Sequence, residues 1–265
     1  MRTDFERAYV TALGPVAVLT LNHPEVMNAV GTRMLGGMMQ ALDFVEARRG
    51  QFRALVLTGE GRSFCTGANL SETREHREGP PDAGRILEQG FHPLLRRMRG
   101  LELPFLTAVN GAAAGIGMSL ALMGDLILAG RSAYFLQAFA RLGLVPDGGS
   151  TWLLPRLIGH ARARELSMLA EKLPAETALS WGLINRLYDD DVLMTEALAM
   201  ANRLAHGPTL ALAATRHLYW ASPHHAFEQQ LDLERQFQRT AGQTEDFAEG
   251  LSAFLQKRDT QFKGK

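Results

Sequence analysis

The sequence has 265 residues, 46% of them apolar, which is enough for one large hydrophobic core or for a core with a smaller satellite. Lysine plus arginine and aspartate plus glutamate number 28 each, so no net charge favours nucleic acid or an anionic membrane as a partner. The single cysteine, Cys65, excludes an intrachain disulfide and fits a reducing compartment. We therefore expect a cytoplasmic protein without nucleic-acid or membrane partners.

The first part of the chain predicts strands that alternate with helices. Residues 1–7 carry charge where an export signal would be apolar, so no such signal is expected. Residues 9–13 and 16–21, separated by Gly14-Pro15, predict a hairpin. A helix follows, with an apolar face made of Met34, Met38, Ala41, Leu42 and Val45. Further strands are expected at 53–58, 103–109 and 126–129, and this alternation implies parallel pairing.

The uncharged run from Phe105 to Gly124 is long enough for a membrane span. The turn dipeptide Asn110-Gly111 and the glycines after it interrupt the run, so a strand, a tight turn and a buried helix explain it better. The polar segment 71–84 predicts a mobile surface loop near the site.

Strand signals stop near residue 191. Three helices are expected beyond it, at 193–205, 209–219 and 226–238, with Pro208 and Pro223 near two of their starts.

Two turns, each running from a strand toward a helix, could hold an anion on main-chain N–H groups. The first lies in the segment from Phe64 to Leu70, and the second runs from Asn110 to Gly117. Amides in the first turn of a helix lack intrahelical acceptors, and two of them converging on one oxygen form an oxyanion hole. Alternatively, the glycines in these turns only permit close packing.

Asp147 is the strongest candidate for an acid or base. It lies between an apolar segment, 142–146, and a predicted helix, so burial could raise the pKa of its carboxyl toward neutrality. A carboxylate of that kind can act as a general base. Alternatively, Asp147 caps the helix that follows it, because an aspartate before Gly-Gly-Ser-Thr is a good N-cap.

Other chemistry finds little support in the sequence. The glycines at 115 and 117 are not followed by the third glycine of a dinucleotide-binding fingerprint, and no phosphate-binding GK[ST] loop occurs. The histidines show no zinc-binding spacing, so no metal is expected. Ser119 has no recognisable triad partners and is better explained as a buried hydroxyl bonded to the preceding turn.

Three segments matter for their order and spacing: Leu21 to Ala29, Phe64 to Leu70, and Ala108 to Gly117. In these respects they resemble the enoyl-CoA hydratase/isomerase (crotonase) family. The resemblance covers essentially the whole chain. The resemblance implies an α/β fold: a spiral of ββα units in a core domain, 1–190, with a C-terminal helical trimerisation region, 191–265. It also implies an acyl-CoA thioester substrate, a homotrimer or a hexamer made of two trimers, and no cofactor, since coenzyme A is part of the substrate.

The resemblance also implies the residues of the site. The family's oxyanion-hole amides fall on Ala68 and Ile116. Substrate contacts are expected at Val26, Met27, Thr66, Ala68, Asn69, Leu70 and Ile116. Phe262, Lys263 and Lys265 could approach a neighbour's CoA phosphates or could belong to a solvated tail.

Departures from the family pattern bear on the reaction. Hydratases of the family use two glutamates, and the matching positions here are Ser119 and Phe139, neither of which can act as a base. The acid at Asp147 resembles the isomerase branch, in which one carboxylate moves a proton. The segments 143–156 and 250–258 are similar to the subfamily of 1,2-epoxyphenylacetyl-CoA isomerases. The alternatives are an enoyl-CoA hydratase of fatty-acid β-oxidation and a non-catalytic, RNA-binding relative.

Overall fold

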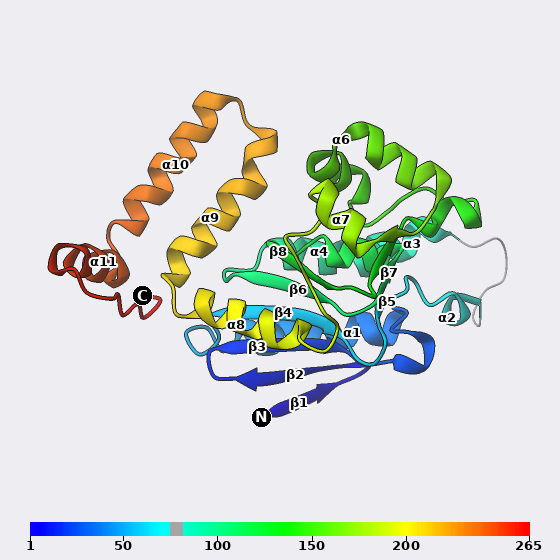
Figure 1. Ribbon diagram of the computed structural model, residues 1–265, viewed down its shortest axis with the longest axis horizontal. Coiled ribbons are helices and arrows are strands. Elements are labelled where there is room, and N and C mark those ends of the chain that lie inside the picture. Colours follow the sequence, from blue (N-terminus) through cyan, green and yellow to red (C-terminus); the bar gives the residue numbers. More distant parts are fainter. Residues whose placement is uncertain (75–81) are drawn as a thin grey trace.

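The computed structural model describes residues 1–74 and 82–265, and Figure 1 shows how their elements are arranged. Within these residues a seven-stranded sheet has the order β1-β2-β3-β4-β6-β8-β11. Its strands are β1 (Arg2–Phe5), β2 (Ala8–Leu13), β3 (Val16–Leu21), β4 (Ala54–Gly59), β6 (Phe105–Val109), β8 (Leu126–Gly130) and β11 (Arg186–Tyr188). The first three strands pair antiparallel, and the others pair parallel. The expected hairpin and the parallel pairing are confirmed.

The central strands of this sheet are buried on both faces, as their continuous apolar sequences require. In β3, Leu19 faces one hydrophobic core and Val18 faces the other, and in β4 Leu57 and Val56 divide in the same way. Side chains that alternate across a strand produce this division. The sheet therefore separates a large core, covered by α1 (Thr32–Glu46) and other helices, from a smaller one covered by α8 (Leu193–Ala205).

A second, smaller sheet has the strand order β10-β9-β7-β5 among the described residues. It consists of β5 (Ser63–Cys65), β7 (Ala112–Ala114), β9 (Tyr134–Leu136) and β10 (Leu173–Pro174). Strand β7 occupies the part of the uncharged run where only a tight turn was expected. No helix in the described part of the chain is long and apolar enough to cross a membrane.

Helices connect the strands and cover both sheets. The remaining α-helices are α2 (Leu70–Arg74), α3 (Ala83–Ile86), α4 (His92–Arg99), α5 (Ile116–Ala121), α6 (Ser150–Leu169), α7 (Ala175–Trp181), α9 (Thr209–Ala221), α10 (Phe227–Ala241) and α11 (Glu245–Gln256). Short helices of other types are η1 (Pro24–Val26), η2 (Leu87–Phe91), η3 (Ala138–Leu142) and η4 (Ser222–His224). All five residues predicted for the apolar face of α1 are buried. The loop expected at 71–84 is wrong for residues 71–74 and 83–84, which are helical, while 75–81 lie outside the described residues.

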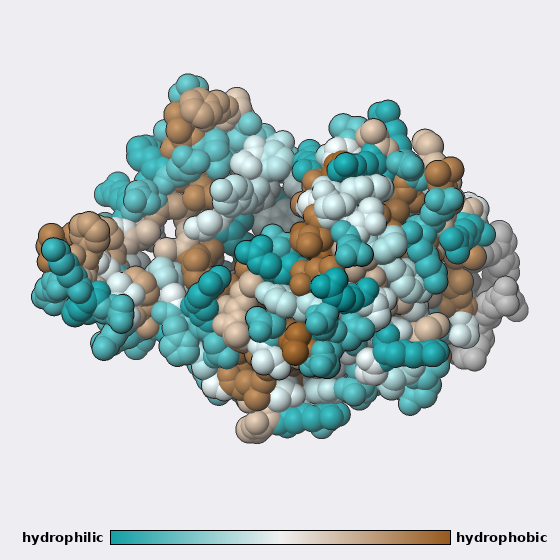
Figure 2. Space-filling view, viewed as in Figure 1, coloured by the Kyte–Doolittle hydropathy of each residue, from teal (hydrophilic) through white to brown (hydrophobic). Residues whose placement is uncertain are grey.

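The C-terminal helices α9, α10 and α11 extend to one side of the two sheets (Figure 1). Helix α8, by contrast, packs directly on β3, β4, β6 and β8. The three helices expected beyond residue 191 are confirmed as α8, α9 and α10. Figure 2 shows apolar side chains on the surface of this C-terminal region. Phe227 of α10 and Phe254 and Leu255 of α11 are exposed. The division into units 1–190 and 191–265 stays a prediction.

Candidate active site

The first turn, between β5 and α2, leaves the N–H of Ala68 free. Ala68 forms an isolated parallel bridge with Val30, in which Val30 N donates to Gly67 O at 2.7 Å and Asn69 N donates to Val30 O at 2.9 Å. In a parallel bridge of this kind the bonds run through the neighbours of the bridged residue, so Ala68 directs its own N–H to the opposite side. The chain therefore presents this donor without losing a bond that stabilises the fold.

The second turn, between β7 and α5, presents the N–H of Ile116. Gly115 has φ +52°, which only glycine adopts readily, and its N–H donates to Leu136 O at 2.8 Å, extending the pairing of β7 with β9. Ile116 is the first residue of α5, where an N–H has no acceptor within the helix. Within residues 1–74 and 82–265, no acceptor bonds to the N–H of Ala68 or of Ile116.

Close backbone contacts bring the two turns together. A Cβ on Gly115 would lie 3.8 Å from Gly67 Cα, and one on Gly67 would lie 3.2 Å from Ala114 O. A Cβ on Gly117 would overlap the carbonyl oxygen of Cys65 and would lie 2.8 Å from its Sγ, so α5 can pack against β5 at this distance only with glycine. The glycines thus permit close packing, and the same turns leave the N–H groups of Ala68 and Ile116 without an acceptor among the described residues, so the two interpretations made from the sequence are compatible.

Asp147 lies in the loop before α6, with one carboxylate oxygen removed from solvent. Its Oδ1 is buried and has no hydrogen-bond partner among the described residues. Burial raises the pKa of the Asp147 carboxyl from 3.8 to about 6. The alternative role as a helix cap is wrong, because α6 has Gly149 as its N-cap and no side chain caps it. Two hydroxyls instead bond the main-chain oxygen of Asp147, Ser119 Oγ at 3.1 Å and Ser150 Oγ at 2.7 Å.

Contacts of the next residue, Gly148, hold this loop against α5. With φ +60°, Gly148 packs so closely that a Cβ would overlap Ile116 Cδ1 and would lie 2.8 Å from Ser119 Oγ. Asp147 is therefore one residue away from a direct contact with the side chain of the proposed oxyanion residue Ile116. Ser119 bonds the Asp147 carbonyl rather than the preceding turn, which corrects the partner expected for its hydroxyl.

The two positions that carry glutamates in hydratases have no acid here. Ser119 is completely buried, and Phe139 is nearly so. The Phe139 ring lies 3.8 Å from the position of a Cβ on Gly115, so it packs directly beside the second turn. Across the described part of the chain, no three His, Cys, Asp or Glu side chains lie close enough together to hold a metal ion.

Some residues expected to contact substrate lie together at the first turn. Thr66 Oγ1 donates to Met27 O at 3.2 Å, and its N–H donates to the same oxygen, so Val26 and Met27 are fixed beside β5. Asn69 is buried and its Nδ2 donates to Glu72 Oε1 at 3.1 Å, whereas Leu70 is half exposed at the start of α2. Their contacts with substrate stay a prediction.

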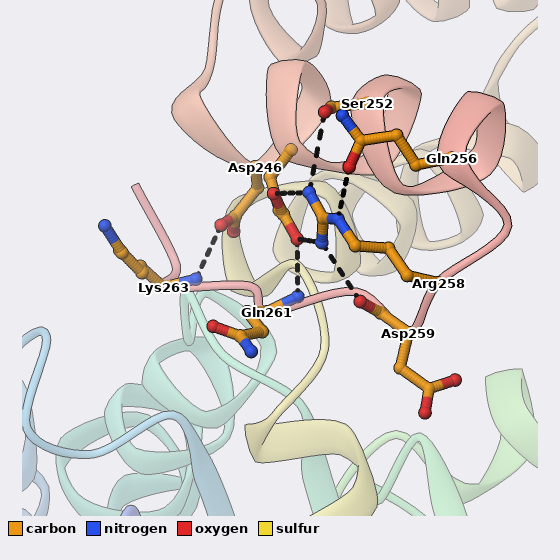
Figure 3. Close-up of polar contacts among 8 residues, drawn as sticks. Asp246, Ser252, Gln256, Arg258, Asp259, Gln261 and Lys263 are labelled. Carbon is orange, nitrogen blue, oxygen red and sulfur yellow. Dashed lines mark hydrogen bonds and ion pairs between the residues drawn. The ribbon is translucent and has the colours of Figure 1, made fainter.

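The C-terminal tail is held on α11 rather than free in solvent (Figure 3). The main-chain N–H groups of Lys263 and Gly264 donate to the two carboxylate oxygens of Asp246 at 2.6 and 2.8 Å. Arg258 pairs with Glu249, and its hydrogen bonds lower the pKa of that carboxyl to about 2. The side chains of Lys263 and Lys265 remain exposed. The main chain of the tail is therefore ordered, and its approach to a neighbour's CoA stays a prediction.

Some residues near Asp147 in the structure could not be grouped with it from the sequence. Trp152, in the first turn of α6, stacks with Trp220 of α9 and with His224 of η4. About 70 residues of chain separate these partners, so neither a motif nor a periodicity could have connected them. Covariation between positions 152 and 220 in related sequences could have revealed the contact between Trp152 and Trp220.

The fold and the two converging turns define an enzyme of the crotonase class. A family model described as enoyl-CoA hydratase/isomerase matches residues 12–265, and the chain belongs to that family. The chain is 45% identical over 251 residues to a 1,2-epoxyphenylacetyl-CoA isomerase of Escherichia coli, covering 94% of this chain and 95% of that protein. It is 44% identical over 250 residues to a probable enoyl-CoA hydratase of Rhodobacter capsulatus, with 94% and 95% covered. The crystal structure of an enoyl-CoA hydratase from Polaromonas superposes with a TM-score of 0.89 at 34% identity, over 96% of this chain and 99% of that one.

Proposed function

We propose that this protein is a CoA-thioester isomerase in which Asp147 moves a proton while the N–H groups of Ala68 and Ile116 hold the thioester oxygen. This proposal is carried by Asp147 Oδ1, which is buried and has no hydrogen-bond partner among the described residues. An acid whose pKa burial raises to about 6 is ionised at neutral pH and is a stronger base than an exposed aspartate. Its loop packs against the helix that begins at Ile116, which favours a role at the same substrate.

The proposed reaction is a proton shuttle. The thioester oxygen accepts hydrogen bonds from Ala68 N–H and Ile116 N–H, so the negative charge that develops on that oxygen is stabilised as the α-proton leaves. Asp147 accepts the α-proton, and the electron pair of the broken C–H bond enters the enolate. Return of a proton from the Asp147 carboxyl to a carbon farther along the chain moves the double bond and regenerates the carboxylate. One base therefore suffices, and the reaction needs no cofactor beyond the CoA of the substrate.

Two reactions of this type fit the chain. The first is migration of the double bond of a 3-enoyl-CoA into conjugation. The second is the 1,2-epoxyphenylacetyl-CoA isomerase reaction, which the 45% identical relative from Escherichia coli supports by its name. Because an enolate stabilised by the same two N–H groups would serve both, we propose that the protein has epoxyphenylacetyl-CoA isomerase activity together with enoyl-CoA isomerase activity.

Hydration of an enoyl-CoA is the competing function, and the 44% identical relative from Rhodobacter capsulatus favours it. A hydratase needs a group that activates water, and both family positions for it hold residues without a carboxylate, Ser119 and Phe139. Mass spectrometry of the product separates the two functions. Given a 3-enoyl-CoA, the protein should form a conjugated product of unchanged mass, which its ultraviolet absorption reveals. Given a 2-enoyl-CoA, it should form no product that has gained the mass of one water. Hydration of the 2-enoyl-CoA without conjugation of the 3-enoyl-CoA would contradict the isomerase proposal.

The pH dependence of turnover should report the ionisation of Asp147. Because the base must be deprotonated, kcat/KM should fall about tenfold for each pH unit below the carboxyl pKa of about 6 and should level off above it. Initial rates with a 3-enoyl-CoA, measured between about pH 4.5 and 8.5 in buffers of constant ionic strength, check this pH dependence of kcat/KM. A profile that stays flat down to about pH 4.5 would contradict burial of the catalytic acid.

We further propose that copies of the chain assemble as a homotrimer, or as two trimers, through the C-terminal helices. Apolar side chains exposed on α10 and α11, including Phe227, Phe247 and Phe254, support an interface there, because a monomer gains nothing by leaving them in water.

A further inference from the structure

A buried glutamine, Gln137, follows directly after β9 in the small sheet. Strands β5, β7 and β9 pair parallel in this sheet, so their carboxyl ends lie at the same edge. The first two strands lead into the turns that present the N–H groups of Ala68 and Ile116, and the third leads into Gln137. The Gln137 side chain is completely buried. It therefore lies at the edge of the sheet that forms the proposed oxyanion hole.

One hydrogen bond joins the Gln137 side chain to α5. Its Nε2 donates to Met118 Sδ at 3.3 Å. Its Oε1 is buried and has no hydrogen-bond partner among the described residues. A buried polar atom without a partner lowers stability, so an apolar side chain of the same shape would suit this position better if packing alone mattered. The contact with Met118 is therefore the better explanation for an amide here.

Three hydrogen bonds form a closed ring of contacts around Ile116. The N–H of Gly115 donates to Leu136 O at 2.8 Å, which joins the second turn to β9. The N–H of Met118 donates to Gly115 O at 3.0 Å. The bond from Gln137 to Met118 closes the ring, because Gln137 directly follows Leu136 in the chain. The residues on both sides of Ile116 are thus held from the end of β9.

This ring fixes the direction of the Ile116 N–H. The carbonyl of Gly115 and the N–H of Ile116 belong to the same planar trans peptide, in which the two groups point in opposite directions. The ψ of Gly115 is −128°, which is not helical, so the regular geometry of α5 does not orient this peptide. The bond from Met118 N to Gly115 O does orient it. The position of Met118 therefore determines where the Ile116 N–H points.

We propose that Gln137 is a positioning residue, which acts through Met118 and the Gly115 carbonyl to aim the Ile116 N–H at the thioester oxygen. This inference rests on the function proposed above. A donor stabilises the developing charge only when it lies within hydrogen-bond distance of that charge, and a displacement of about 1 Å can lower the rate on the order of 10²-fold. Because Gln137 acts indirectly, its loss should cost less than the loss of a donor.

Gln137→Met should lower kcat for isomerisation of a 3-enoyl-CoA about 5- to 50-fold and should change KM less than about twofold, because the donor is displaced rather than removed. Methionine is unbranched and of similar length, so the variant loses the N–H donor and the unpartnered oxygen but keeps the packing. Its unfolding temperature should be no lower than that of the wild type. If Gln137 were only structural, activity and stability would fall together.

Met118→Leu removes the same hydrogen bond from the other side and should lower kcat within the same range. The double variant, Gln137→Met with Met118→Leu, should lose no more than about twofold beyond the slower single variant, because both changes remove one contact. Met38→Leu is the matched control, since Met38 is completely buried on α1, and it should keep kcat within about twofold. Losses that multiply in the double variant would overturn the inference.

Infrared difference spectroscopy of bound hexanoyl-CoA, labelled with carbon-13 at the thioester carbonyl, tests the donor itself. Hydrogen bonds to this oxygen should lower its stretching frequency in the wild-type protein, and Gln137→Met should lessen that lowering. The measurement involves no proton transfer, so its outcome does not depend on Asp147. An equal lowering in both proteins would overturn the inference and leave the proposed function standing. No lowering in the wild-type protein would contradict the oxyanion hole, and this inference with it.

Discussion

Asp147→Asn should lower kcat/KM for isomerisation of a 3-enoyl-CoA about 10²- to 10⁴-fold, the range that a positioned general base contributes. The amide is nearly isosteric with the carboxylate but cannot accept the α-proton. Because Gly149 caps α6 and Asp147 Oδ1 makes no hydrogen bond with a described residue, the substitution removes no polar contact of that atom. Initial rates at pH 8, where the carboxyl with its pKa of about 6 is ionised, give the full difference.

The stability of Asp147→Asn should separate a catalytic from a structural role. A carboxyl whose pKa is raised in the folded state binds its proton more tightly there than in the unfolded chain. That contribution to stability is complete below the unfolded pKa of 3.8 and is lost as the pH rises through about 6. At pH 8 the Asn variant should therefore unfold at a temperature no lower than the wild type. Asp232→Asn, at an exposed position on α10, serves as the control and should keep full activity.

Ala68→Pro should lower kcat about 10²- to 10³-fold, because proline has no N–H and a single oxyanion-hole donor contributes about 3 kcal/mol to transition-state stabilisation. The N–H of Ala68 points away from Val30, so its loss removes no hydrogen bond of the bridge between them. Single-turnover rates with a 3-enoyl-CoA measure the effect on the chemical step.

Ala68→Gly is the matched control for this donor, since it changes the side chain and keeps the N–H. Its kcat should stay within a few fold of the wild type. Near-full activity of Ala68→Pro would mean that the thioester oxygen is held elsewhere, and a circular dichroism spectrum unlike that of the wild type would identify a folding defect instead.

The sequence predicts the regular elements of this fold well where the hydrophobic period is clear. The face from Met34 to Val45 and the helix from Leu193 to Ala205 are found as expected, because burial of one helical face sets their spacing. Strand β7, Ala112–Ala114, was missed because three alanines have little strand preference of their own. Its pairing with β9 supplies what the local sequence lacks.

The candidate site, like the fold, could be predicted from the sequence only in part. The turns at Gly67 and Gly115 could be identified from the sequence, because glycine adopts a positive φ more readily than other residues. Both glycines do have a positive φ in the structure. The choice between a cap and a base at Asp147 could not be made from the sequence, because both roles suit an aspartate before Gly-Gly-Ser. The structure excludes the cap, since Gly149 is the N-cap of α6, and the buried Oδ1 of Asp147 supports the proposed role as a base. The stacking of Trp152 with Trp220 was not predictable, because it depends on the position of α9, where Arg216 pairs with Asp125 and donates to Met98 O.

Exchange of the α-hydrogens of a 3-enoyl-CoA in D2O tests the central role of Asp147 most directly. The wild-type protein should transfer hydrogen at the α-carbon, so that deuterium enters the product or the recovered substrate as the Asp147 carboxyl exchanges with solvent. Asp147→Asn should show almost no incorporation. Incorporation is followed by nuclear magnetic resonance. If the Asn variant incorporated deuterium at the wild-type rate, another group would remove the proton, and the role proposed for Asp147 would be wrong.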